Sequence, residues 1–347
     1  RLDLLAHCVS GPLLVSHGPH VRWACGFSGS NGWLLLRDGK AHLLTDARYR
    51  EQASQQVGPK VDLVVTQDPL AEALAPLVAH HGTLSVQDAC LTLAQSKSIT
   101  ALVSGLTLHA TGDTVERLVA VKTQEQVDTI VRAQRISEAV LEQVSGRITV
   151  GMSEQQIAAE LVYGCLRRGA QRMAFEPIVA SGPNSALPHA RPTERVWQSG
   201  EPLLIDMGCV VDGYASDMTR MLHAGVPSDA FGDAYDSVRA AQEAAVVAAK
   251  PGADAAHVDS AARRLLQAAG LGEQFSHGLG HGIGLETHEW PRLSGQVDYT
   301  IPADCVVTIE PGVYLPGLWG IRIEDMIWVR HGEAERLTNT PADLRIV

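Results

Sequence analysis

The sequence lacks several features that would indicate other classes of protein. No two of its six cysteines have the spacing C-x-x-C, which excludes a zinc ribbon and a thioredoxin-type motif. No run of apolar residues approaches 18, so we expect no membrane-spanning helix. Lys and Arg (28) are fewer than Asp and Glu (39), and a net charge of −11 argues against nucleic acid or an anionic membrane as a partner. A cytoplasmic enzyme is the remaining expectation, with its thiols reduced.

The length and the hydrophobic content predict two domains with large cores. The chain has 347 residues, of which 45% are hydrophobic. Short strands and helices alternate in the first third, including a hairpin over 32–46 around Asp38-Gly39. We therefore predict an N-terminal α/β domain with a mixed sheet at 1–117, and a second domain at 118–347. The segment that starts at Thr114 is expected to change from strand to helix.

The second domain shows the order helix, helix, extended region twice. Thr123 with Gln126, and Ser153 with Gln156, have the spacing of a capping box and predict the starts of the first two helices. The four helices are expected at 123–145, 153–168, 228–249 and 254–269. An extended region follows each pair, at 173–225 and at 275–330. No repeat of individual residues is visible, but the repeated order predicts a domain with pseudo-two-fold symmetry.

Two carboxylates are expected to lie close together in the first extended region. Asp212-Gly213 marks a turn between two apolar runs. A hairpin centred on this turn places Asp206 and Asp217 on facing strands, opposite or diagonal to each other. Because neighbouring carboxylates repel, this arrangement destabilises the fold unless a cation, a base or a shared proton compensates.

The second extended region repeats this pattern. Glu310 and Glu324 lie at equal separations in sequence from Gly317, and both interrupt apolar runs. Charged groups in such runs are seldom buried unless they are paired or bound to metal. Each carboxylate alone also fits a surface position beside an Arg or a Lys, but the two pairs together favour a site for two divalent cations. With one imidazole added, this oxygen-rich set suits Mn²⁺, Co²⁺ or Zn²⁺.

Glycines alternate with other residues at the start of the segment 278–291, GLGHGIGLETHEWP. A phosphate-binding loop is not supported, because no P-loop motif and no strand–GxGxxG–helix context is present. A zincin motif is not supported either, since Arg292 occupies the place of its second histidine. We interpret the glycines as positions of close backbone approach in a strand or bulge beside a crowded site. Four histidines in or near such segments are candidates for that site: His189, His277, His281 and His288.

These segments resemble the metallopeptidase family of prolidase, aminopeptidase P and methionine aminopeptidase, which shares the pita-bread fold. The matching segments are IVASGPNSALPH (178–189), DMGCVVDGYASDMTR (206–220), HGLGHGIGLETHEWP (277–291), TIEPGVYLPG (308–317) and IRIED (321–325). They follow the order of the family and span most of 123–347. LLTDARYREQA (43–53) resembles the N-terminal, creatinase-type domain of the proline-directed members, which methionine aminopeptidases lack.

The resemblance implies a set of residues with specific roles. The implied ligands of two metal ions are Asp206, Asp217, His281, Glu310 and Glu324, with Asp217 and Glu324 bridging the ions. The implied substrate-facing residues are His189, His277 and His288. Arg292 matches a position that can face the substrate carboxylate in prolidases, and Arg322 matches an arginine that supports the ligands or contacts the substrate.

The implied reaction is hydrolysis of the X–Pro bond in Xaa-Pro dipeptides by a hydroxide that bridges two divalent ions. Mn²⁺ is the expected metal, with Co²⁺ or Zn²⁺ as alternatives. We expect Glu310 to carry a proton to the proline nitrogen, and His288 and His189 to stabilise the oxyanion.

Two alternatives stay open at this point. An aminopeptidase P would share every ligand but would take longer peptides with proline second, although the compact length and HEWPR favour the dipeptidase. A protein that binds peptides without cleaving them could use the same fold, although the intact ligand set argues against it. Relatives with this two-domain plan are commonly homodimers, so we expect a homodimer by analogy.

Overall fold

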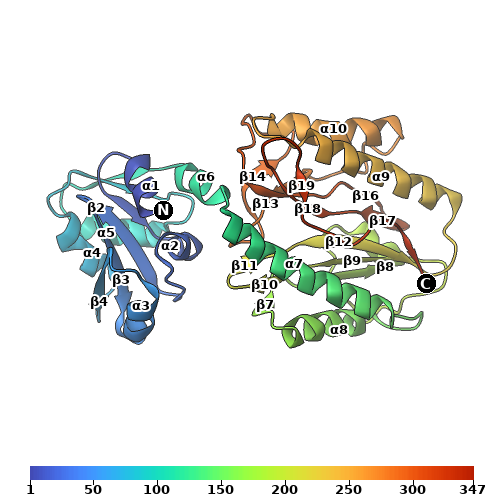
Figure 1. Cartoon of the computed structure of the whole chain (residues 1–347), viewed down its shortest axis with the longest axis horizontal. Helices are drawn as coiled ribbons and strands as arrows, with labels where there is room; N and C mark the ends of the chain where they lie inside the picture. The colour runs from blue at the N-terminus through green and yellow to red at the C-terminus, as the bar shows by residue number, and fades with distance from the viewer. The chain divides into compact units, whose positions relative to one another are not determined.

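The computed structural model describes residues 1–347, which divide into two compact units, Arg1–Val119 and Ala120–Val347 (Figure 1). No helix in the chain is both long enough and apolar enough to cross a membrane. Each unit has its own sheets and its own hydrophobic core. The mixed α/β fold with two successive units agrees with the predicted fold class.

The N-terminal unit is built on one six-stranded mixed sheet with the order β4-β3-β2-β1-β5-β6. Strand β2 is antiparallel to β1 and β3, and the other pairs are parallel. Asp38 and Gly39 have φ of 48° and 73°, which confirms the turn predicted between β2 and β3. The strands are β1 (Leu13–Val15), β2 (Gly32–Arg37), β3 (Lys40–Asp46), β4 (Val61–Thr66), β5 (Thr83–Val86) and β6 (Thr107–Ala110).

Helices α1 to α6 accompany this sheet, and the last of them corrects one prediction. The segment Thr114–Ala120 is helix α6 throughout, so the expected strand at its start is wrong. Val115 and Val119 are spaced by one helical turn and are both buried, which favours the helix over a strand. The other five are α1 (Leu2–Cys8), α2 (Gly18–Cys25), α3 (Arg50–Gln56), α4 (Leu70–Val78) and α5 (Leu93–Leu102).

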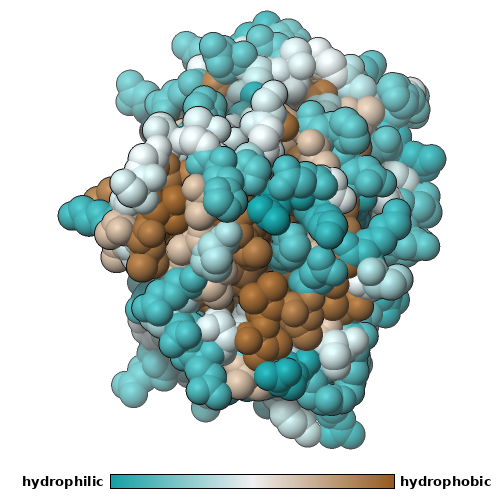
Figure 2. Space-filling model, turned by 90° about the vertical axis from the view of Figure 1, so that its left-hand side faces the viewer, coloured by the Kyte–Doolittle hydropathy of each residue, from teal (hydrophilic) through white to brown (hydrophobic).

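The surface carries apolar residues among the polar ones. Figure 2 shows a face on which hydrophilic residues prevail and hydrophobic residues gather in separate patches. In the N-terminal unit, the exposed large hydrophobic residues are Leu4, Leu93 and Leu102. Patches of this kind are usual on protein surfaces.

The second unit repeats the order of two helices followed by strands, as predicted. Helices α7 (Gln124–Ser145) and α8 (Glu154–Arg167) form the first pair, and both predicted capping boxes are present. Helices α9 (Asp229–Ala248) and α10 (Ala255–Ala268) form the second pair. The strands after the first pair are β7 (Arg172–Met173), β8 (Ile178–Ser181), β9 (Pro202–Met207), β10 (Cys209–Val211), β11 (Tyr214–Ala215) and β12 (Met218–His223). Those after the second pair are β13 (Gly280–Gly282), β14 (Glu289–Leu293), β15 (Val306–Ile309), β16 (Gly312–Leu315), β17 (Trp319–Arg322), β18 (Asp325–Trp328), β19 (Glu335–Arg336) and β20 (Arg345–Ile346).

The strands of this unit lie between the two helix pairs (Figure 1). The buried faces of α7 and α8 pack with Val179, Leu203 and Ile205 from the first set of strands. The faces of α9 and α10 pack mainly with the second set, including Val307 and Ile327. An isolated β-bridge between Thr219 and Glu324 joins the two sets. The middle of the unit is therefore where the strands of both halves meet.

Candidate active site

The first pair of acidic residues lies on the hairpin of β9 and β12. Asp206 pairs with Thr219, and Asp217 immediately precedes β12, so the two carboxylates are diagonal neighbours. Asp212 and Gly213 both have positive φ at the tip of the inner β10–β11 hairpin. The predicted hairpin and the proximity of its two carboxylates are confirmed.

The second pair of acidic residues lies between two antiparallel strand pairs, β15–β18 and β16–β17, which continue in the same register. Ile309 pairs with Asp325 and Gly312 pairs with Arg322, so Glu310 and Glu324 occupy matching positions between these pairs. The bridge from Glu324 to Thr219 then brings this pair beside the first one. Carboxylates from sequence positions about a hundred residues apart therefore converge at one point.

His281 lies in the middle of β13, where the register with β14 shifts after it. A Cβ on Gly280 would lie 2.0 Å from the carbonyl oxygen of Thr308, and a Cβ on Gly282 would lie 2.3 Å from that of Trp290. The glycines are therefore required because neighbouring strands approach β13 very closely. This confirms their interpretation as positions of close approach at a bulge.

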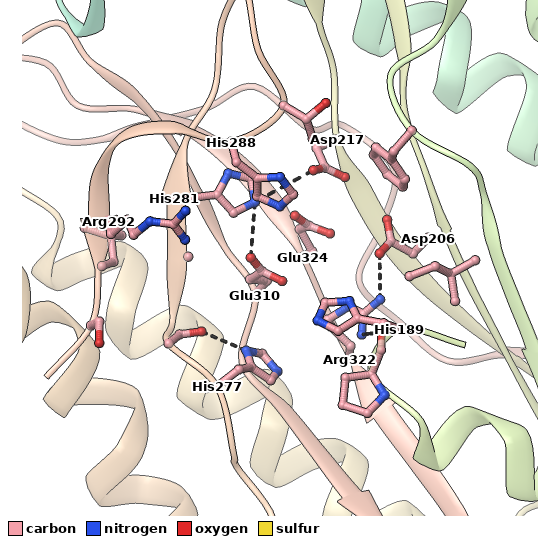
Figure 3. A pocket seen from close by; sticks show the side chains of 18 of the residues that line it. His189, Asp206, Asp217, His277, His281, His288, Arg292, Glu310, Arg322 and Glu324 are labelled. Carbon is pink, nitrogen blue, oxygen red and sulfur yellow. Dashed lines mark hydrogen bonds and ion pairs between the residues drawn. The ribbon is translucent and has the colours of Figure 1, made fainter. Parts of the chain in front are cut away.

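All ten residues predicted for the site line one cavity of about 600 Å³ (Figure 3). The five predicted ligands face its interior, with His288 beside His281 and with Arg322 beside Asp206. The remaining wall includes Phe175 and Tyr314, and the ion pair of Glu176 and Arg191 lies at the rim. The other predicted residues on the wall are His189, His277 and Arg292.

Four of the five predicted ligands form a compact group. The ligand atoms of Asp217, His281 and Glu324 all lie within 4.8 Å of one another. His281 Nε2 is 3.3 Å from Glu310 Oε1 and 3.9 Å from Asp217 Oδ2. Asp206 lies beside this group and is paired with Arg322, whose Nη2 is 2.6 Å from Asp206 Oδ2.

This donor set fits divalent cations on the chemistry of its atoms. Asp206 Oδ1 and Asp217 Oδ1 are buried and have no hydrogen-bond partner, which is costly for a carboxylate oxygen unless a cation binds it. Arg322 is the only arginine or lysine that forms an ion pair with any of the four carboxylates, and it balances Asp206 alone. An imidazole with four carboxylates matches the ligand preferences of Mn²⁺, Co²⁺ or Zn²⁺.

Burial and mutual repulsion raise the pKa of the carboxyl groups. Burial, followed by repulsion from the other carboxylates, raises the pKa of Asp217 and of Glu324 well above the ordinary range. Burial also raises the pKa of Glu310 to about 8, with Asp206 adding repulsion. Burial, with His288 nearby, lowers the pKa of His281 to about 3, so that its ring is neutral and its Nε2 can bind a metal ion.

Three hydroxyl groups orient this site, and the sequence analysis did not identify them. Thr219 donates to Glu324 Oε2 at 2.7 Å and accepts from Arg322 Nε at 3.1 Å. Thr308 accepts from the backbone N–H of His281 and donates to Glu310 Oε1. Tyr314 bonds both His277 and Arg322. The only available signal was position: each lies two or four residues from a predicted ligand, within a matching segment.

The substrate-facing candidates differ in how they are held. The His277 ring bonds the carbonyl of Gly278 and the Tyr314 hydroxyl, and burial lowers its pKa to about 4. The His288 ring lies 4.3 Å from that of His281, and burial lowers its pKa. Both His189 and Arg292 are exposed at the rim and make no side-chain hydrogen bond within the protein.

Arg322 is held more tightly than a simple substrate contact requires. It is 3% exposed, and its donors bond Asp206, Thr219, Tyr314 and the carbonyl of Pro188. Burial lowers the pKa of Arg322, but Tyr314, followed by the carboxylates around it, holds that pKa well above its usual range. Of the two roles expected for Arg322, support of a ligand therefore fits its contacts better.

Comparison with known sequences identifies the family. Residues 128–331 match the sequence pattern described as metallopeptidase family M24. The chain belongs to metallopeptidase family M24. Residues 11–121 match the creatinase/prolidase N-terminal domain. The predicted family is confirmed, and so is the predicted pita-bread fold of the second unit.

Similar M24 proteins include dipeptidases and an aminopeptidase. An Xaa-Pro dipeptidase from Pyrococcus horikoshii is 32% identical over 96% of this chain and 93% of its own length. The structure of an Xaa-Pro dipeptidase from Bacillus anthracis has a TM-score of 0.95 and 32% identity, covering 100% of this chain and 99% of that one. An X-Pro aminopeptidase structure from Thermotoga maritima has a TM-score of 0.89 and 33% identity, covering 97% of both chains.

Proposed function

We propose that this M24 metallopeptidase is an Xaa-Pro dipeptidase whose catalytic domain, residues 118–347, holds two divalent cations. One observation supports this most directly: four carboxylates and one neutral imidazole line a single cavity in which two buried carboxylate oxygens have no partner. The similarity to proteins named Xaa-Pro dipeptidase supports the choice of substrate. Mn²⁺ is our expected metal, with Co²⁺ or Zn²⁺ as alternatives.

The residues that would hold the cations are Asp206, Asp217, His281, Glu310 and Glu324. When bound, the cations would supply a water acidic enough to attack the peptide carbonyl near neutral pH. Neutral His281 needs to lose no proton to become a ligand, whereas the carboxyl groups with raised pKa release protons as cations bind.

Glu310 is the proposed carrier of a proton to the leaving nitrogen. Its carboxylate lies at the edge of the ligand group, with Oε1 at 3.3 Å from His281 Nε2, where it could accept a proton and pass it on. Thr308 bonds that same oxygen and limits its orientation. The proline nitrogen needs this proton in order to leave as an amine. Because the peptide nitrogen of proline carries no N–H, the site needs no hydrogen-bond acceptor beside it.

His288 and His189 are the proposed donors to the oxyanion that forms when the carbonyl is attacked. The lowered pKa of His288 keeps its ring neutral at pH 7, with one N–H to donate. We propose that His277, fixed by Tyr314, forms the wall against the proline ring. Arg322 would act mainly through Asp206.

Arg292 is the proposed determinant of dipeptide length. Its guanidinium lies at the rim without a bond to any carboxylate of the protein, so it is available for the C-terminal carboxylate of a dipeptide. An aminopeptidase is a second candidate, because the Thermotoga maritima structure has a sequence identity of 33%, against 32% for the two dipeptidases described above. A longer peptide has no carboxylate at this position.

The test compares Ala-Pro, Ala-Pro-Ala and Ala-Ala as substrates, with Mn²⁺ added to protein from which metals were removed. We expect Ala-Pro to be cleaved best and Ala-Ala poorly. Preferred cleavage of Ala-Pro-Ala would favour the aminopeptidase, and cleavage of none with full Mn²⁺ occupancy would contradict both. Arg292→Ala should raise KM for Ala-Pro and leave KM for Ala-Pro-Ala unchanged. Sedimentation of the same sample tests the expected homodimer.

A further inference from the structure

A fully buried carboxylate outside the proposed ligand set holds together the loop that carries His189. Glu154 is the first residue of α8 and is 0% exposed. Such a group is costly to bury unless its oxygens are fully hydrogen-bonded or ion-paired. Glu154 forms no ion pair, because the guanidinium of nearby Arg195 bonds Glu201 and Ser181 instead.

Six hydrogen bonds satisfy this carboxylate, and all come from two short stretches of chain. Ser181 donates its N–H and its hydroxyl to Oε1, at 2.7 and 2.8 Å. Thr193 donates its N–H and its hydroxyl to Oε2, at 3.0 and 2.6 Å. The amide of Asn184 donates to both oxygens, at 3.0 and 3.1 Å. Glu154 therefore ties both ends of the 181–193 segment to one point.

The tip of this segment reaches the active-site cavity. Pro188, His189, Ala190 and Arg191 all line it. The carbonyl of Pro188 accepts from Arg322 Nη1 at 3.2 Å, which holds the tip from the cavity side. The segment is thus held at its base by Glu154, in its middle by a bond from the Gly320 N–H to Ser185 Oγ, and at its tip by the Pro188 bond and the exposed ion pair of Arg191 with Glu176.

His189 depends on this segment more than the other histidines depend on theirs. His277 and His281 form hydrogen bonds through their rings, and His288 packs against His281. The ring of His189 is exposed and has no hydrogen bond within the protein. Its place in the cavity is therefore set by the backbone of 181–193 alone.

We infer that Glu154 is a positioning residue that acts on the reaction through His189. This inference rests on the proposed function for the role of His189, but the attachment of the loop to Glu154 does not. A carboxylate can only accept hydrogen bonds, and all six hydrogen bonds at Glu154 are donated to it. In Glu154→Gln the new amide group would face the N–H groups of Asn184 and of Ser181 or Thr193, which cannot accept a hydrogen bond from it, so the segment would shift or loosen.

The kinetic test is a double-mutant cycle with Glu154→Gln and His189→Ala, assayed on Ala-Pro with Mn²⁺. We expect Glu154→Gln alone to lower kcat/KM about 100-fold, the loss that a displacement of about 1 Å can cause. In the His189→Ala background the same substitution should cost less than about 3-fold. Equal losses in both backgrounds would overturn the inference, because a general structural defect does not depend on His189.

Glu138→Gln is the matched control. Glu138 is also a buried carboxylate, and it accepts from the backbone N–H groups of Asn339 and Thr340, far in sequence from the loop. Its substitution should have equal effects in both His189 backgrounds. Thr193→Val removes one of the six donors and serves if Glu154→Gln does not fold; it should show the same dependence on His189 with a smaller loss.

Hydrogen exchange gives a readout that needs no activity. In Glu154→Gln, amide exchange should become faster in peptides that cover 182–193, and bound metal should stay at the wild-type amount. Unchanged exchange in 182–193 would overturn the inference even if activity fell. If the wild-type protein cleaves no Xaa-Pro peptide, the proposed function fails and this exchange measurement alone decides the role of Glu154.

Discussion

Replacing Glu310 by glutamine should make the metal-free protein more stable at alkaline pH. Burial raises the pKa of Glu310 from its ordinary 4.5 to about 8, because the folded site lacks enough positive charge for its carboxylates. A carboxyl group with a raised pKa contributes stability below pH 4.5, and that contribution is lost as the pH rises to about 8. At 1.36 kcal/mol for each pH unit, the loss amounts to about 5 kcal/mol. Glutamine does not ionise in this pH range, so the Glu310→Gln variant does not undergo this loss of stability.

The neighbouring carboxyl groups make the effect larger, not smaller. Repulsion by Glu310 is one of the causes that raise the pKa of Asp217 and of Glu324. Removing the charge of Glu310 therefore relieves these groups as well. The stability advantage of Glu310→Gln over the wild type should grow steadily between pH 4.5 and 8.

Urea unfolding followed by tryptophan fluorescence measures this difference at several pH values in the presence of EDTA. Glu333→Gln, at an exposed loop position, is the control and should leave the pH dependence of the wild type unchanged. Saturating Mn²⁺ should remove the alkaline loss in the wild type, because cations replace the protons on the carboxylates. A difference between Glu310→Gln and wild type that changes by less than about 1 kcal/mol across this range would refute the reasoning.

Three further predictions concern the same site, and a fourth, on helix α9, is a control for the third. Asp217→Ala and Glu324→Ala should each lose bound Mn²⁺, measured by mass spectrometry, and lose Ala-Pro hydrolysis; a variant that keeps both would contradict the proposed ligand set. Thr219→Val should lower the free energy of unfolding by about 1.5–3 kcal/mol, because it removes a buried bond to the Glu324 carboxylate, and a change below about 0.5 kcal/mol would count against that role. Gly280→Ala should cost about 3 kcal/mol in urea unfolding, since its Cβ would lie 2.0 Å from the Thr308 carbonyl oxygen. Gly232→Ala, in open space on α9, should instead gain about 0.5–1 kcal/mol.

Local signals in the sequence predicted the helices of the second unit accurately. The capping boxes at Thr123 and Ser153 form within four residues, so their spacing is visible in the chain. The wrong prediction of a strand at Thr114 has a tertiary cause. Val115 and Val119 have high strand propensity, but their spacing buries them on one face of a helix, and tertiary packing decides the structure.

The carboxylate pairs were predictable because each lies on one hairpin with a recognisable turn. The contact between the pairs was not, since it depends on the bridge from Thr219 to Glu324 across 105 residues. No property of Thr219 by itself marks it as the residue at that junction. Glu154 was equally hidden: the sequence shows an ordinary acidic residue in the first turn of a helix, and only the fold buries it under the loop of His189.

The connection between the two halves of the second unit also divides the proposed ligands unequally. Asp206 and Asp217 precede the connection at 225–228, whereas His281 and the two glutamates follow it, and Val226 within it is 89% exposed. A chain cut at this connection would yield two fragments, each with an incomplete set of donors. Association of the fragments through the hydrophobic clusters that both halves share would complete the set. Binding of two cations would then require both fragments and would report their complementation.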